Sequence, residues 1–184
     1  ALSAELAREL NARHGVRVLG PLGFENAYAL AMRRSEAERL GVRTLADLAR
    51  VAPELAIGGD IEFFARPEWA AVERGYGLRF REKRSYQPTF MYRALSSGDV
   101  DVISAFSSDG RIAADDLVLL ADPKAALPPY DALILVAPGR AEDERLVGAL
   151  RPLVNAVPLA AMQKANLMVD GQGRSPADAA ASLK

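Results

Sequence analysis

Three aromatic residues and one arginine stand at the edges of expected elements, where an α/β sheet presents its ligands. Tyr28 opens an expected strand, Phe106 closes another, and Tyr130 precedes a third. Arg66 ends a polar loop just before Pro67, which favours a helix start. Ring faces attract a quaternary ammonium group, which cannot donate a hydrogen bond, and an arginine grips a carboxylate bidentately. These residue types therefore predict a binding site for a methylated cation.

Five other aromatic residues fall inside expected elements at core spacing, and we assign them to packing. They are Phe63, Trp69, Phe80, Phe90 and Tyr92. Ordinary packing is also the alternative explanation for each site ring taken singly. An exposed ring face contributes only ~0.5–1 kcal/mol and a desolvated one ~2 kcal/mol, so tight binding of a cation needs several rings together.

Motifs for catalysis and metal binding are missing from the sequence. The single histidine, His14, lies beside Gly15 at an expected helix end, where the helix dipole favours a cation. With no cysteine and no second histidine, thiolate and imidazole metal sites are excluded. Ser107 stands near Asp109, but no general base lies within reach in the sequence. We therefore expect no enzyme, no metal and no cofactor, and we assign Asp109 mainly to a turn or hinge.

The 184 residues carry 23 basic and 24 acidic side chains, and half of the residues are apolar. This balance is typical of a globular protein, and it lacks the basic field that recruits nucleic acid. No stretch approaches the ~18 apolar residues of a membrane span. No signal-peptide pattern opens the sequence, so either the protein is cytosolic or a signal precedes this numbering.

Strands that alternate with helices predict an α/β protein with a largely parallel sheet. The expected strands are 16–20, 27–32, 55–59, 78–82, 100–106 and 131–137, with a break at 21–23. A first helix is expected to carry Leu2, Leu6 and Leu10 on a single face, and another helix is expected to start at Pro67. Further helices are expected at 88–97, 141–150, 157–169 and 176–183. Helix N-caps are expected at Ser35, Thr44 and Ser175, each with an acidic residue three positions later.

Three segments resemble substrate-binding proteins of osmoprotectant ABC transporters. PLGFENAYALAMR (21–33) resembles that family's "GFNNTYAL" segment, and FFARPEWAAVERGYGLRF (63–80) is similar to "F..RPDG…L..AYGL.F". The most specific match is GDVDVISAFSSDGRIAADDLVLLADPKAALPPYDA (98–132), which is similar to "G.VDVI.AYSTDGRI…DLV.L.DDK..FPPY.A". The resemblance extends from about residue 15 to the end.

This resemblance implies a type II periplasmic binding protein, in which two α/β lobes close on a quaternary amine and deliver it to an ABC permease. The implied ligands are glycine betaine, choline, carnitine or proline betaine, and the residues do not choose among them. The implied location is a periplasm or the extracytoplasmic face of a membrane, with any signal or anchor outside this sequence.

The resemblance also implies roles for individual residues. Tyr28, Phe106 and Tyr130 match aromatic positions of the family's ligand box, and Arg66 matches the arginine that holds a betaine carboxylate. Phe106 departs from the tyrosine of "AYSTDG", so the ring is kept and a hydroxyl is lost. Two secondary candidates, Ser107 and Asp109, fall inside the same motif.

By this resemblance the chain divides into a remnant of lobe one with a crossover (1–24), lobe two (25–125), and a return crossover with helices of lobe one (126–184). The family's opening strand–helix segment, which carries another wall of the box, has no match here. We therefore expect one complete α/β lobe plus part of a second, and weak binding by this chain alone. If that segment is absent, strand 131–137 exposes an edge that favours dimerisation or swapping.

The leading hypothesis is thus a non-enzymatic receptor for a quaternary amine osmolyte. A ligand-sensing regulatory module on the same fold, without transport, is the alternative, and a fused DNA-binding domain would favour it. An enzyme on a binding-protein scaffold is a third reading, which would need a base near Ser107.

Overall fold

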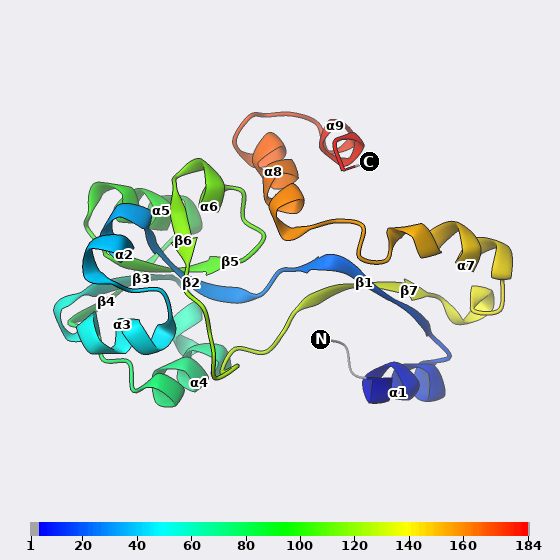
Figure 1. The fold of residues 1–184 in the computed structure, drawn as a ribbon, viewed down its shortest axis with the longest axis horizontal. Helices are drawn as coiled ribbons and strands as arrows, with labels where there is room; N and C mark the ends of the chain where they lie inside the picture. Colours follow the sequence, from blue (N-terminus) through cyan, green and yellow to red (C-terminus); the bar gives the residue numbers. More distant parts are fainter. Residues whose placement is uncertain (1–3, 184) are drawn as a thin grey trace.

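The computed structural model describes residues 4–183, and its main body is a five-stranded sheet flanked by helices (Figure 1). The strands lie in the order β4-β3-β5-β2-β6. Their bounds are β2 (Tyr28–Arg33), β3 (Ala56–Asp60), β4 (Glu82–Tyr86), β5 (Val102–Phe106) and β6 (Leu117–Leu119). The short β6 was not among the predicted strands.

Strand β2 runs against both of its neighbours, β5 and β6, whereas β3 is parallel to β4 and β5. The prediction of a largely parallel sheet is therefore wrong for β2. The connections also differ. One α-helix lies between each pair of successive strands from β3 to β6, whereas two α-helices lie between β2 and β3.

The described residues also contain α-helices. They are α1 (Ala4–His14), α2 (Arg34–Leu40), α3 (Leu45–Val51), α4 (Pro67–Tyr76), α5 (Pro88–Ser97), α6 (Arg111–Ala114), α7 (Glu144–Leu150), α8 (Leu159–Asp170) and α9 (Pro176–Ala181). Leu2, predicted on the first helix, lies outside the described residues.

Two of the three predicted N-caps are confirmed. Thr44 forms a reciprocal capping box with Asp47, and the Ser175 side chain accepts from the backbone N–H of Asp178. The N-cap at Ser35 is wrong, because α2 already begins at Arg34 and has no side-chain cap.

Hydrophobic cores cover both faces of the larger sheet. Leu30 and Met32 of β2 point into one core, and Ala31 between them points into the other, as the two-residue period of a strand requires. The first core also holds residues of α3 and α4, and the second holds residues of α5. The sheet therefore offers its ends, and not its faces, to a ligand.

The predicted strand 78–82 is wrong, since pairing with β3 begins only at Glu82. The alternation that suggested it comes from Leu78 and Phe80, which pack onto the core after α4 has ended. The true strand, β4, is an edge strand with charged residues at Glu82, Lys83 and Arg84, and such residues discourage pairing with other chains.

A long two-stranded antiparallel ribbon, β1 (Arg17–Glu25) with β7 (Asp131–Val136), leaves this body and carries α1 and α7 at its far end (Figure 1). The predicted break at 21–23 is wrong, because β1 continues through it with register irregularities. Gly23 has φ +113°, and a Cβ there would lie 2.9 Å from the carbonyl oxygen of Val157. The glycine therefore allows the chain at 155–157 to approach β1.

Helix α8 returns toward the main body and packs against α6, and α9 packs against α8 (Figure 1). Gln163 donates to the carbonyl oxygen of Ser107 at 2.7 Å, and Asn166 donates to that of Ser108 at 2.8 Å. This part of the C-terminal region is thus fixed to the loop that follows β5.

Candidate functional site

Tyr28 and Phe106 form a cross-strand pair where the larger sheet meets the ribbon. They are directly opposite in the β2–β5 register, and their ring centroids lie 4.6 Å apart at an interplanar angle of 36°. Phe106 keeps 39% of its surface exposed. Burial raises the pKa of Tyr28 above its ordinary value, so this ring stays neutral at physiological pH. The pair forms a small, uncharged aromatic surface.

Buried aromatic residues pack against the Tyr28 ring of this pair. The Phe63 ring centroid lies 5.3 Å from that of Tyr28, and Trp69 lies 5.5 Å from Phe63. The assignment of Phe63, Trp69 and Tyr92 to packing is confirmed, since each is at least nine-tenths buried. The same assignment is wrong for Phe90, which is 57% exposed on α5.

Arg66 lies above the Tyr28 ring. It precedes Pro67 and takes an extended conformation at the N-cap of α4, as a residue before proline should. The guanidinium carbon lies 5.2 Å from the Tyr28 ring centroid, within cation–π range. Hydrogen bonding to Glu68 raises the pKa of Arg66, so its charge is permanent.

Glu68, which the sequence analysis did not select, joins the arginine to the third predicted ring. Its Oε1 atom accepts from Nη2 of Arg66 at 3.2 Å and from the hydroxyl of Tyr130 at 2.9 Å. Glu68 is only 7% exposed, and the bond from Arg66 is the main reason that its pKa lies below the ordinary value. Its place in the quoted RPE segment, two positions after Arg66, was the available signal.

Two polar atoms of this pair have no hydrogen-bond partner in the described part of the protein. They are Nε of Arg66 and Oε2 of Glu68, and both are buried. The Nε atom is a donor and the Oε2 atom is an acceptor, so the Arg66–Glu68 pair can still form one hydrogen bond to an acceptor and one to a donor.

The structure brings the four primary candidates into one continuous series of contacts. Phe106 contacts Tyr28, Tyr28 contacts Arg66, Arg66 contacts Glu68, and Glu68 contacts Tyr130. Tyr130 joins through the carboxylate and not by stacking on the other rings. The hydrogen bond raises the pKa of Tyr130, and the ring is 44% exposed.

Ser107 forms hydrogen bonds at the junction between the ribbon and the larger sheet. Its hydroxyl donates to the carbonyl oxygen of Glu25 at 2.9 Å and accepts from the backbone N–H of Ala27 at 3.0 Å. The side chain is buried. These contacts give Ser107 a structural task at the junction between β1 and β2.

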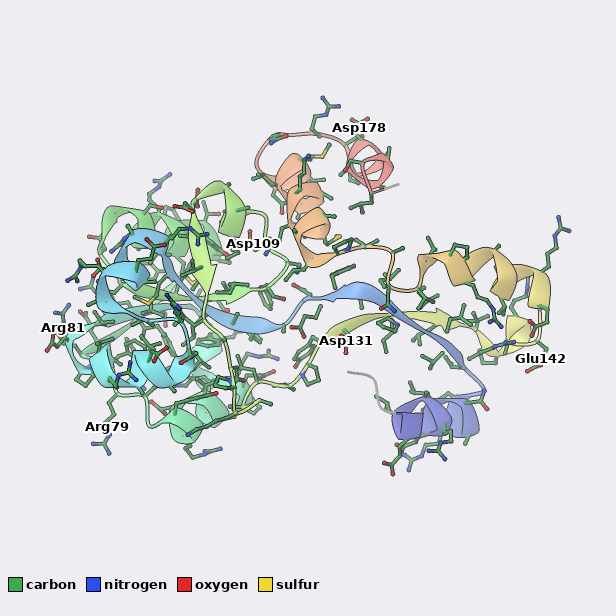
Figure 2. The ribbon with its side chains drawn as sticks, in the orientation of Figure 1. Arg79, Arg81, Asp109, Asp131, Glu142 and Asp178 are labelled. Atoms are coloured by element: carbon green, nitrogen blue, oxygen red, sulfur yellow. The ribbon has the colours of Figure 1, made fainter. Side chains whose placement is uncertain are left out.

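Asp109 lies at the end of the main body that faces α8 (Figure 2). Its carboxylate accepts from the hydroxyl of Tyr92 at 2.8 Å and from the side chain of Arg111 at 3.1 Å. The Arg111 guanidinium in turn lies 3.7 Å from the centre of the Tyr92 ring. Burial alone would raise the pKa of Asp109, but the bonds from Arg111 and Tyr92 together lower it.

Tyr28 lines three hollows around this site. The largest, of about 460 Å³, also has Ser107, Pro128 and Pro129 in its walls. A cavity of about 80 Å³ lies between the ring pair and the Tyr92–Asp109 contact. The larger hollow falls within the usual size range of small-molecule sites, roughly 300–1,000 Å³, and of the four primary candidates Tyr28 alone is in its wall.

Within residues 4–183, no cluster of acidic or histidine side chains is arranged to hold a metal ion. Over the same residues, none of the helices combines the length and the apolar character needed to cross a bilayer. The chemistry that the described site can offer is therefore ring faces, one guanidinium and one buried carboxylate.

Comparison with known proteins gives consistent matches. Residues 1–183 match the OpuAC family, described as the substrate-binding domain of ABC-type glycine betaine transport systems. The carnitine transport binding protein OpuCC of Listeria monocytogenes is 32% identical over 162 residues, which cover 84% of this chain and 51% of that protein. A glycine-betaine-binding protein of Pseudomonas aeruginosa is 32% identical and covers 100% of this chain and 63% of that protein.

A solved structure agrees with these matches. The crystal structure of a glycine betaine/carnitine/choline ABC transporter has a TM-score of 0.89 at 28% identity, and covers 96% of this chain and 65% of that one. The chain thus spans between half and two thirds of the length of these relatives.

Proposed function

Because the chain belongs to the family of substrate-binding domains of ABC-type glycine betaine transport systems, we propose that it binds a quaternary ammonium solute for import. Family membership and the type II periplasmic-binding-protein fold were both predicted from the sequence, and both are confirmed. The family's description, a substrate-binding domain, also agrees with the prediction that the chain is not an enzyme.

The observation that carries the proposed site is the Arg66 cation above the Tyr28–Phe106 pair, 5.2 Å from the Tyr28 ring. A trimethylammonium group has no N–H donor, so ring faces are the groups that can recognise it. In this proposal the ammonium group of the ligand packs on the exposed faces of Tyr28 and Phe106. The Tyr130 ring approaches it from the return segment.

Arg66 would hold the carboxylate of a betaine or of carnitine. Its Nη2 atom already binds Glu68, and its Nη1 atom lies 4.0 Å from a carboxylate oxygen of Glu62. A ligand carboxylate would therefore share the arginine with these two acidic side chains. The proposal therefore makes choline, which has no carboxylate, less dependent on Arg66 than glycine betaine is.

The remaining parts of the proposal follow from the family. The ligand is captured as two lobes close, residues 25–125 forming the complete one, and an ABC permease on the extracytoplasmic face receives it. Two or three ring faces contribute ~2–5 kcal/mol, so we expect this chain alone to bind with a Kd in the millimolar range.

Titration of the 184-residue protein with glycine betaine, carnitine and choline, followed by NMR chemical shifts, tests the proposal. Saturable shifts of the Tyr28 and Phe106 ring signals are expected. Arg79→Ala provides the control, because Arg79 projects from the end of the main body away from the ribbon (Figure 2). The absence of saturable shifts with all three ligands would overturn the proposal.

A further inference from the structure

Residues 122–130, which we call the strap, run along α4 from its last turn to its first. At the C-terminal end of α4, the hydroxyl of Tyr76 donates to Oδ1 of Asp122. At the N-terminal end, the hydroxyl of Tyr130 donates to Glu68. Figure 1 shows the chain descending from β6 to α4 and then entering β7. The strap is therefore attached to one helix at both of its ends.

Asp122 is the centre of the first attachment. Its Oδ2 atom accepts from the backbone N–H of Leu127 at 2.8 Å, while its Oδ1 atom is bound to Tyr76. The Tyr76 hydroxyl also accepts from the backbone N–H of Lys124 at 2.7 Å, and the Lys124 ammonium group donates to the carbonyl oxygen of Gly75 at 2.6 Å. One carboxylate thus fixes both the start and the middle of the strap.

Beyond Leu127 the strap has little freedom. Leu127 packs against the hydrophobic core of the main body. Pro128 and Pro129 follow, and each proline ring fixes its own φ angle. The next residue is Tyr130, whose carbonyl oxygen accepts from the backbone N–H of Asn26 at 3.0 Å. A shift at Leu127 is therefore passed through a stiff spacer to the Tyr130 ring.

We propose that Asp122 is a positioning residue for ligand binding: by holding the strap on α4 through Tyr76 and Leu127, it sets where the Tyr130 ring meets the ligand. This inference rests on the proposed function, because it assigns Tyr130 to the site. Asp122 also lies in the wall of the 460 Å³ hollow, together with Leu127 and Pro128, so the test must separate positioning of Tyr130 from direct contact with a ligand.

The test compares Asp122→Ala with Asp101→Ala in the full chain. Asp101 is a matched control, because its carboxylate also accepts a backbone N–H bond of 2.8 Å, from Ala56, and is also partly buried. We expect Asp122→Ala to weaken glycine betaine binding by about three- to tenfold, the equivalent of one or two lost hydrogen bonds. Asp101→Ala should leave the affinity unchanged.

A double-mutant cycle separates positioning from general loosening. If Asp122 acts through Tyr130, the Asp122→Ala effect should disappear in a Tyr130→Ala background. An effect of equal size in both backgrounds would overturn the inference. Tyr76→Phe provides a second variant if Asp122→Ala does not fold, since it breaks the same attachment and keeps the ring.

A measurement without ligand distinguishes failure of the inference from failure of the proposed function. The amide of Asn26 bonds to the carbonyl oxygen of Tyr130, so its hydrogen exchange reports whether Tyr130 is held in place. We expect faster exchange at Asn26 in Asp122→Ala and in Tyr76→Phe, but not in Asp101→Ala. Unchanged exchange would overturn the positioning role. Faster exchange with no binding by the unsubstituted protein would overturn the proposed function alone.

Discussion

The hydroxyl of Tyr130 lies 2.9 Å from Oε1 of Glu68, a residue 62 positions earlier in the chain. The same oxygen accepts a bond of 3.2 Å from Arg66. One buried carboxylate thus connects the return segment to the start of α4. It also occupies part of the guanidinium that a ligand carboxylate would need, so Glu68 influences both the geometry and the charge of the site.

Arg66→Ala should weaken glycine betaine binding by more than tenfold and choline binding by much less. A charge-assisted, bidentate contact with a carboxylate is about twice as strong as a neutral hydrogen bond, and choline cannot form it. NMR titration with both ligands measures the two affinities, with Arg79→Ala as the control. Equal losses for the two ligands would remove the carboxylate-binding role.

Glu68→Gln should raise the affinity for glycine betaine relative to that for choline by about three- to tenfold. The substitution keeps an acceptor for Tyr130 but removes the negative charge that competes for Arg66 and attracts the ammonium group. The ratio of the two dissociation constants is the measurement. A ratio unchanged from that of the unsubstituted protein would show that Glu68 does not tune the charge of the site.

Phe106→Ala should lower the affinity for every quaternary amine by about three- to thirtyfold, the value of one ring face. Phe106→Tyr should bind about as well as the unsubstituted protein, since the ring is retained. Phe90→Ala serves as the control, because that ring is exposed on α5 outside the contact series. If Phe90→Ala and Phe106→Ala lose the same affinity, the ring pair is not the recognition surface.

Gly110→Ala should destabilise the protein by about 2–3 kcal/mol through overpacking. A Cβ at Gly110 would lie 2.4 Å from the backbone nitrogen of Leu167, where α8 packs on α6. Gly148→Ala, in α7 with no atom within 4 Å of the added carbon, should stabilise by about 0.5–1 kcal/mol. Urea unfolding of both variants tests these two predictions. Similar urea midpoints for the two variants would contradict the close approach of α8 to Gly110.

The pH dependence of Asp109→Asn should reveal the Tyr92–Asp109–Arg111 contacts. The folded pKa of Asp109 lies below its ordinary value of 3.8, so its ionisation stabilises the fold above that value. The extra stability is lost as the pH falls from 3.8 through the folded pKa. Free energies of unfolding from urea titrations should therefore differ by ~1.5–3 kcal/mol near neutral pH and converge in acid. A constant difference at all pH values would contradict this linkage.

Much of the secondary structure was accessible from the sequence, because its signals are local. Gly98 ends α5 and Thr44 with Asp47 starts α3, and both act within a few residues. Strands β5 and β7 were visible from their dense apolar and β-branched residues. The four primary site positions, Tyr28, Arg66, Phe106 and Tyr130, were suggested by their residue types at the edges of expected elements, and the matched segments of the resemblance contain all four.

What the sequence could not determine depends on contacts between distant positions. The direction of β2 is set by its pairing with β5 and β6, which come much later in the chain, and the contacts of Glu68 and Asp122 span 62 and 46 positions. In the sequence alone, Glu68 and Asp122 look like solvated acidic residues, because their tyrosine partners come from distant positions and reach them only in the folded chain. The sequence therefore determined which residue types were available, and the packing of α4 against the strap decided which of them act together.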